Sequence, residues 1–330
     1  MLDPITLDAA KAVTAYPTAI ATARWKPLGT AGGFSGARLW HGVAADGRKF
    51  ALKVHPTGAD VARLENIIHR WMITARQVGL DFVPAVERTR AGRTVVEAGG
   101  RLWDVIGWMP GKADFHDDPS DFRLVAAVTA LARIHTAWAA ERSIGPCPAI
   151  ERRWQAFIEW EKLVASGWRP DFDSADPVRS AAESAWSVLP RVTPVVQPAI
   201  MHWLPQSVLL QPCLCDIWHD HVLFDGDRVS GIIDFAAAKV DHVAVDLARL
   251  LGSLIPDQQP RTDSALAAYT AIRPLPQPEL VPLLDRTGTI VAVINWLRWL
   301  YHDGREYPNR NVVAERLTAL TKRLGGFGFC

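Results

Sequence analysis

The segment that decides the fold reads Leu214-Cys215-Asp216-Ile217-Trp218-His219-Asp220-His221-Val222-Leu223-Phe224 and is followed by Ile232-Ile233-Asp234-Phe235. Two short apolar runs, 222–224 and 229–233, flank Asp225-Gly226-Asp227-Arg228, which predicts a tight β-hairpin. Asp216 and Asp234 stand at the two ends of this hairpin, 18 positions apart. Because a hairpin brings its ends together, we expect one carboxylate to orient a hydroxyl group and the other to hold a metal ion.

The chain before residue 110 has the pattern of a small antiparallel sheet. Short strand candidates are joined by turn-forming runs such as Ala44-Ala45-Asp46-Gly47 and Gly99-Gly100, which indicate hairpins. One helix interrupts them at 58–78, where apolar residues recur at helical spacing and Gly79 supplies the C-cap. The strand candidates are 24–28, 37–43, 49–55, 94–97 and 102–108.

Helices dominate after Gly111. Residues 124–140 carry apolar side chains at helical spacing, and Asp176 followed by Pro177 marks another helix start. The other expected helices are 150–166, 177–189, 243–254, 279–302 and 311–324. We therefore predict an α+β protein with a nucleotide-binding sheet lobe at 1–108 and a larger, mainly helical lobe at 109–330 that contains the hairpin.

Two N-terminal elements suit a ligand that carries phosphates. Glycines in the run 29–36 let backbone N–H groups approach phosphate oxygens closely. In Phe50-Ala51-Leu52-Lys53-Val54, Ala51 and Lys53 share one strand face, which suits an adenine ring with an ammonium group reaching its phosphates. Glu65, in the following helix, is the expected partner of Lys53. The loop residues predicted to bind nucleotide are Gly32, Gly33, Ser35 and Gly36.

The ordered set of motifs resembles the aminoglycoside phosphotransferase/choline kinase group of the protein-kinase-like superfamily. That group carries H-G-D-x-x-x-x-N, a hairpin and I-D-[WF], where this chain has L-C-D-I-W-H-D-H and G-I-I-D-F. The resemblance runs from the glycine run through Ala51-x-Lys53, residues 107–111 and residues 131–135 to Asp246-Leu247-Ala248. It implies a two-lobed protein-kinase-like fold.

The resemblance also implies a role for each matching residue. Lys53 would meet the α- and β-phosphates, and Asp234 would bind the metal ion. Asp216 would orient or deprotonate the acceptor hydroxyl, and Asp246 would brace the catalytic loop. The residues whose backbone would meet adenine are Gly107, Trp108 and Met109. The implied reaction moves the γ-phosphate of ATP, with GTP as the alternative, to a hydroxyl of a small metabolite with Mg²⁺ or Mn²⁺.

Two positions depart from the family pattern. Leu214 replaces a histidine, and His221 replaces the asparagine that binds a second metal ion. Mg²⁺ prefers oxygen ligands and imidazole is softer, so His221 as a metal ligand leaves the identity and number of ions open. Asp220 is a candidate for the missing oxygen donor. The alternative function is a degenerate kinase fold that binds nucleotide or a partner without catalysis.

A structural zinc site is a weaker alternative in the same segment. Cys213, Cys215, His219 and His221 place four potential ligands within nine residues. A closed site so compressed would leave no room for the strand that starts at residue 222.

Composition limits the possible partners and compartment. The 330 residues are 49% hydrophobic and 22% charged, with a formal net charge of +1, so no global field would hold nucleic acid or an anionic membrane. The N-terminus lacks a signal-peptide pattern and no apolar run approaches about 20 residues, which predicts a cytoplasmic protein. Residues 241–330 hold nine Asp/Glu against ten Lys/Arg, which shows no acidic wall for a polycation. A small hydroxylated metabolite is the expected partner, and no protein partner is implied.

Overall fold

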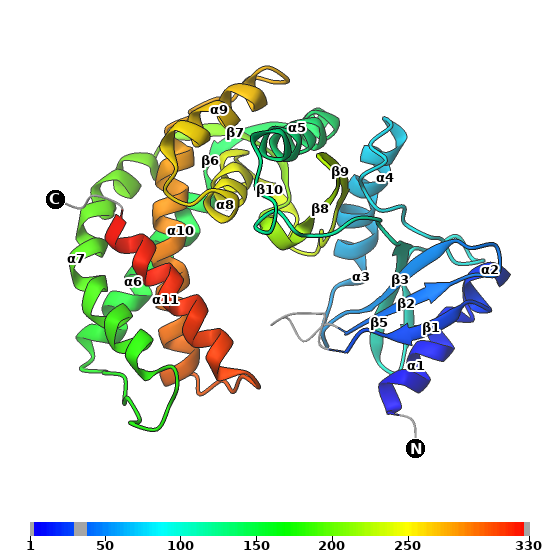
Figure 1. The fold of residues 1–330 in the computed structure, drawn as a ribbon, viewed down its shortest axis with the longest axis horizontal. Helices are drawn as coiled ribbons and strands as arrows, with labels where there is room; N and C mark the ends of the chain where they lie inside the picture. The colour runs from blue at the N-terminus through cyan, green and yellow to red at the C-terminus, as the bar shows by residue number, and fades with distance from the viewer. Residues whose placement is uncertain (1–2, 30–37, 327–330) are drawn as a thin grey trace. The chain divides into compact units, whose positions relative to one another are not determined.

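The computed structural model describes residues 3–29 and 38–326 (Figure 1). Packing divides the chain into two compact units, Met1–Ala140 with His219–Lys239, and Glu141–Trp218 with Val240–Cys330. The first unit therefore contains the hairpin and Asp234 in addition to the N-terminal sheet. The lobe boundary at residue 108 stays a prediction. Four predicted nucleotide-binding residues, Gly32, Gly33, Ser35 and Gly36, lie outside the described residues.

The first unit contains the predicted antiparallel sheet, with five strands in the order β1-β2-β3-β5-β4. Phe50, Leu52 and Val54 alternate onto one face of β3, where they join a buried cluster with Trp40 and Trp103. A helix that the sequence patterns did not predict, α1, adds three small apolar residues to this cluster. The elements are α1 (Pro4–Val13), α2 (Thr18–Ala21), β1 (Arg24–Pro27), β2 (Arg38–Val43), β3 (Lys49–Val54), β4 (Val96–Ala98) and β5 (Arg101–Gly107).

The predicted helix over 58–78 is present but is not uniform. It consists of α3 (Val61–Arg63), a wider π-helical turn η2 (Leu64–His69) and α4 (Arg70–Gln77). His69 ends the wide turn and is buried, with Nε2 3.1 Å from Oδ2 of Asp104 on β5 and Nδ1 2.8 Å from Oγ1 of Thr94. His55 approaches the same Asp104 oxygen at 2.8 Å. A single buried carboxylate thus links β3, β5 and the helix.

The remainder of the first unit consists of α5 and the hairpin. α5 (Asp121–Ala137) begins at Ser120, whose hydroxyl accepts a hydrogen bond from the Arg123 amide. The short 3₁₀ helix η4 (His219–His221) leads into β8 (Val222–Asp225) and β9 (Arg228–Ile232), which pair antiparallel and confirm the predicted hairpin. α5 contacts β9. A further 3₁₀ turn, η3 (Ala139–Glu141), follows α5 at the boundary between the units.

The second unit is mainly helical, with a small sheet in the order β10-β7-β6. α10, with its π-helical extension η5, contacts α6, α7, α8 and α11. The stretch Leu280–His302 is long and apolar enough to cross a membrane, but 56% of its most apolar 18-residue window is buried inside the protein, as in a core helix. The elements are β6 (Ser143–Pro146), α6 (Pro148–Ala165), α7 (Arg179–Trp203), β7 (Ser207–Cys213), β10 (Lys239–Asp241), α8 (Ala244–Leu254), α9 (Gln259–Thr270), α10 (Leu280–Leu297), η5 (Arg298–His302) and α11 (Arg310–Gly326).

The length of α7 differs from the prediction, which ended this helix at residue 189. α7 continues to Trp203 through Pro190, Pro194 and Pro198. The three prolines are four residues apart and exposed, so they share the outer face of the helix. Each removes one backbone hydrogen bond on the solvated side, while the inner face buries Val192, Val196 and other apolar residues. Packing of that inner face therefore outweighs the helix-breaking tendency of proline.

The buried Asp104 cluster yields a prediction about stability. Burial raises the pKa of Asp104, but hydrogen bonds from His55 and His69 outweigh burial and hold it far below its ordinary value. A depressed pKa contributes stability that is complete above the unfolded value, about 3.9, and is lost as the pH falls through the folded value. We expect D104N to lower the free energy of unfolding at pH 7 by about 3 kcal/mol and by less at pH 3.

Urea denaturation at pH 7 and pH 3 measures this difference. D81N is the matched control, because Asp81 is an exposed carboxylate that pairs with Arg76 on the surface. Equal losses in D104N and D81N would contradict the assignment of Asp104 as the buried link.

Candidate active site

Lys53 and Asp234, which are 181 positions apart, form an ion pair in the first unit. Lys53 Nζ lies 2.9 Å from Asp234 Oδ1, and the two side chains are 18% and 41% exposed. Alternation along β3 directs Lys53 away from the apolar cluster. Asp234 adopts a left-handed backbone conformation with φ of 59°, which is uncommon outside glycine and frequent at functional positions. The structure thus brings together the predicted phosphate-binding and metal-binding residues.

His221 lies beside this pair. Its Nε2 is 3.9 Å from Asp234 Oδ2, and its carbonyl accepts the Ile233 amide at 2.9 Å. Burial raises the pKa of Asp234, but the Lys53 ammonium and then His221 outweigh it, so the pKa lies below the ordinary value. An ionised carboxylate fits Mg²⁺, which binds one or two carboxylates together with substrate phosphates. The His221 imidazole fits Mg²⁺ less well than an oxygen ligand does.

The expected pairing of Glu65 with Lys53 is wrong. Glu65 instead accepts hydrogen bonds from Arg93 Nε at 2.9 and 2.8 Å and from the Thr94 and Val95 amides at 3.0 and 3.2 Å. The wide turn of η2 places Glu65 and His69 against the same segment, residues 93–95. A guanidinium and two backbone N–H groups offer the carboxylate more donors than one ammonium does. Spacing along the chain gave no sign of Arg93 as a competitor.

The segment after β5 is fixed by close backbone packing within the first unit. The Gly107 amide donates to Ala85 and the Trp108 amide donates to Lys49. Within the described ranges 3–29 and 38–326, no hydrogen bond involves the Met109 amide, so Met109 is the best placed of the three to contact a base. Gly231 of β9 is needed here, because a Cβ at that position would lie 2.7 Å from Met109 Cβ.

In the second unit, Asp246 holds the backbone that leads to Asp216. Its carboxylate accepts the Leu214 amide at 2.7 Å and the Cys215 amide at 2.6 Å. Cys215 has a φ of 64°, so the residue before Asp216 is also left-handed. Leu214, where the family has histidine, is buried. The family resemblance implies that Asp246 braces this loop, and these two hydrogen bonds are compatible with that role.

Arg249, which the sequence analysis missed, contacts the predicted catalytic residue Asp216. Its Nε and Nη2 lie 3.1 and 2.6 Å from Oδ1 of Asp216. Arg249 is three residues beyond Asp246 on α8, so one helical turn carries both the loop support and this guanidinium. That i, i+3 spacing in Asp246-Leu247-Ala248-Arg249 was the available signal.

The contacts of Cys213 do not favour the zinc alternative. Cys213 is fully buried, and its sulfur lies 3.4 Å from the Asp241 carbonyl and 3.5 Å from the Gln211 carbonyl. Burial, followed by the nearby Asp246 charge, raises the pKa of this thiol. A protonated thiol that donates to carbonyl oxygens is not a ready zinc ligand.

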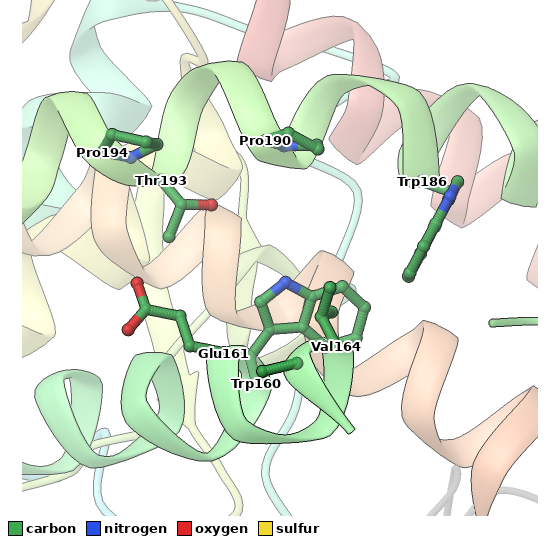
Figure 2. Close-up of a pocket in the computed structure, with 8 residues that line it drawn as sticks. Trp160, Glu161, Val164, Trp186, Pro190, Thr193 and Pro194 are labelled. Carbon is green, nitrogen blue, oxygen red and sulfur yellow. The ribbon is translucent and has the colours of Figure 1, made fainter. Parts of the chain in front are cut away.

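A separate hollow lies between α6 and α7 and has a volume of about 290 Å³ (Figure 2). Trp160 and Glu161 of α6 face Pro190 and Pro194 of α7 across it. Trp160, Trp168 and Trp186 pack edge to face at 5.5–6.1 Å, so two of its walls belong to an aromatic cluster. None of the predicted site residues lines this hollow.

Comparison with known proteins places the chain in a family. Residues 28–279, more than half of the chain, match the phosphotransferase enzyme family. The chain belongs to this family. A homoserine kinase of Methylobacterium radiotolerans is 29% identical to it over 228 residues, which make up 65% of this chain and 64% of that protein. The chain thus spans about 64% of the length of such curated relatives.

Solved structures of phosphotransferases share the fold. Spectinomycin phosphotransferase in complex with ADP and spectinomycin has a TM-score of 0.66 at 12% identity, over 93% of this chain and 92% of that one. The microcompartment-associated aminopropanol kinase has a TM-score of 0.62 at 16% identity, over 96% and 95% of the two chains. At these identities the likeness shows the fold alone, and it confirms the antiparallel sheet lobe and the helical lobe.

The Lys53–Asp234 ion pair yields a second prediction. We expect K53M to raise the pKa of Asp234, because burial then acts without the ammonium that opposes it. A carboxyl ¹³C NMR titration measures this pKa directly. K49M is the control, since Lys49 lies on the same face of β3, four residues before Lys53 and opposite Val43. An unchanged Asp234 titration in K53M would show that the ion pair is not populated in solution.

Proposed function

We propose that this phosphotransferase moves the γ-phosphate of ATP to a hydroxyl of a small metabolite. The observation that carries the proposal is the Lys53–Asp234 ion pair with His221 beside it, because it places a cation for phosphates and a carboxylate for a metal ion at one point. Lys53 binds the α- and β-phosphates, and the backbone near Met109 binds the base. Asp234 holds the divalent ion, Mg²⁺ or Mn²⁺, which neutralises charge on the phosphates when bound.

Asp216 is the proposed catalytic residue. Its carboxylate orients the acceptor hydroxyl and takes its proton as the hydroxyl oxygen forms a bond to the γ-phosphorus. The bond from that phosphorus to the β,γ-bridging oxygen breaks, and ADP leaves with the electron pair. Asp246 contributes by fixing the Leu214–Cys215 backbone through two hydrogen bonds, so it is a positioning residue.

Homoserine is the first acceptor to test, because several relatives at 26–34% identity are homoserine kinases. GTP is the alternative donor. A cytoplasmic location is proposed because the reaction consumes ATP. The degenerate-kinase alternative draws its support from His221 and is the opposing outcome of the following test.

Calorimetry and a coupled ADP assay test the proposal together. We expect metal-dependent ATP binding that D234A weakens, and turnover that D216N lowers by about 10²- to 10⁴-fold with ATP binding intact. D225N is the control, because Asp225 is an exposed carboxylate in the hairpin turn. ATP binding without turnover on any acceptor would support the degenerate kinase. A D216N variant as active as wild type would overturn the role of Asp216.

The metal preference gives a separate prediction. We expect H221N to shift activity from Mn²⁺ toward Mg²⁺ by roughly tenfold, because an amide oxygen replaces an imidazole beside Asp234. The ratio of turnover in Mn²⁺ to turnover in Mg²⁺ measures the shift. H219N controls for the loss of a nearby imidazole, since His219 pairs with Asp220 instead. Equal ratios in wild type, H221N and H219N would show that His221 does not contact the ion.

A further inference from the structure

The contact between Arg249 and Asp216 bears on which acceptor the enzyme takes. Both Nε and Nη2 of Arg249 engage a single oxygen, Oδ1 of Asp216. A guanidinium has five N–H donors in a planar fork that matches both oxygens of a carboxylate. Among the residues that the structure describes, these two contacts are the hydrogen bonds of Arg249. The ion pair with Asp216 therefore uses only some of the five N–H donors of the Arg249 guanidinium.

This ion pair is open to solvent. The Arg249 and Asp216 side chains are 41% and 46% exposed. Ion pairs that are solvated to this extent contribute little net stability, so another carboxylate can replace one partner at small cost. Exchange would leave Arg249 paired and would release the Asp216 oxygen for an acceptor hydroxyl.

Other cations of the second unit reinforce the preference for an anion. Arg316 of α11 lies 4.8 Å from the ring centre of Trp218, two residues after Asp216. Burial, and to a smaller extent the charges of Arg152 and Arg249, lower the pKa of Arg153 to about 10, which places Arg153 within the field of Arg249. The acids that act on Arg153 include Asp241 and Asp285, which are already paired with Arg152 and Arg323. A polycation would meet repulsion here, and an anionic group would meet attraction.

We propose that Arg249 binds a carboxylate of the acceptor and that the acceptor is therefore a small hydroxy acid. In the absence of acceptor, Asp216 occupies the Arg249 guanidinium. On binding, the acceptor carboxylate takes the guanidinium, and its hydroxyl meets the released Asp216. The inference rests on the proposed function and adds to it the class of acceptor and the residue that selects it.

Three acceptors that differ by one group test the inference. Homoserine carries hydroxyl, amine and carboxylate, 4-hydroxybutyrate lacks the amine, and 3-aminopropan-1-ol lacks the carboxylate. We expect wild-type kcat/KM to be roughly 10- to 100-fold higher for the two acids than for the amino alcohol. R249M should remove this preference through a rise in KM for the acids, and R249K should restore part of it. R261M is the control, because Arg261 lies on α9 and contacts Gln258.

Each other outcome is decisive. Equal use of all three acceptors by wild type overturns the inference and leaves the kinase proposal standing. Transfer to none of them with ATP binding intact also overturns the inference, and it favours the degenerate kinase. An equal loss of kcat on every acceptor in R249M would make Arg249 a positioning residue for Asp216 and also overturns it. If metal-dependent ATP binding is absent, the proposed function fails first. Thermal melts of each variant confirm that the fold is retained.

Discussion

The Asp246 carboxylate is the constraint on which the backbone before Asp216, the proposed catalytic residue, depends. It accepts hydrogen bonds from two consecutive backbone amides, those of Leu214 and Cys215; the first is buried and the second is partly buried. Two charge-assisted hydrogen bonds from adjacent residues fix the peptide plane between them and stabilise the left-handed conformation of Cys215. The next residue is Asp216, so the backbone that carries the proposed catalytic side chain is positioned by a carboxylate from α8.

In the first unit, two acids lie within reach of β3, and only one of them pairs with Lys53. Asp104 lies directly opposite Lys53 in the pairing of β3 with β5. It is nevertheless bonded through Oδ2 to His55 and His69, while Lys53 reaches Asp234. The two imidazoles keep the buried carboxylate paired without drawing on the ammonium. The paired strands can therefore hold a buried ionic cluster at Asp104 and leave the opposing Lys53 to pair with Asp234.

Local sequence patterns and the order of motifs were sufficient to predict the fold class. They did not reveal which side chains pair when the residues are distant in the sequence. Alternation in 50–54 predicted the face of Lys53, and the turn residues 225–228 predicted the hairpin, because both depend on neighbours in the chain. Glu65 was predicted to pair with Lys53, but it pairs with Arg93, which is 28 positions away. The wide turn of η2 places Glu65 against Arg93, and the sequence pattern did not predict that turn. α7 was predicted too short because the solvated placement of its three prolines depends on tertiary packing.

The count of acidic and basic residues in the C-terminal part of the chain is a second property that the sequence alone could not interpret. Residues 241–330 are nearly balanced, which by itself indicates no preference for an anionic or a cationic acceptor. In the structure, many of these charges form ion pairs. Asp285 pairs with Arg323, and Asp303 pairs with His302 and Arg305. Arg249 and Arg316 instead lie against the 216–218 turn. The net charge of these ninety residues conceals this arrangement, because ion pairs cancel charge locally. The field at a ligand beside Asp216 depends on the charges that the fold places there.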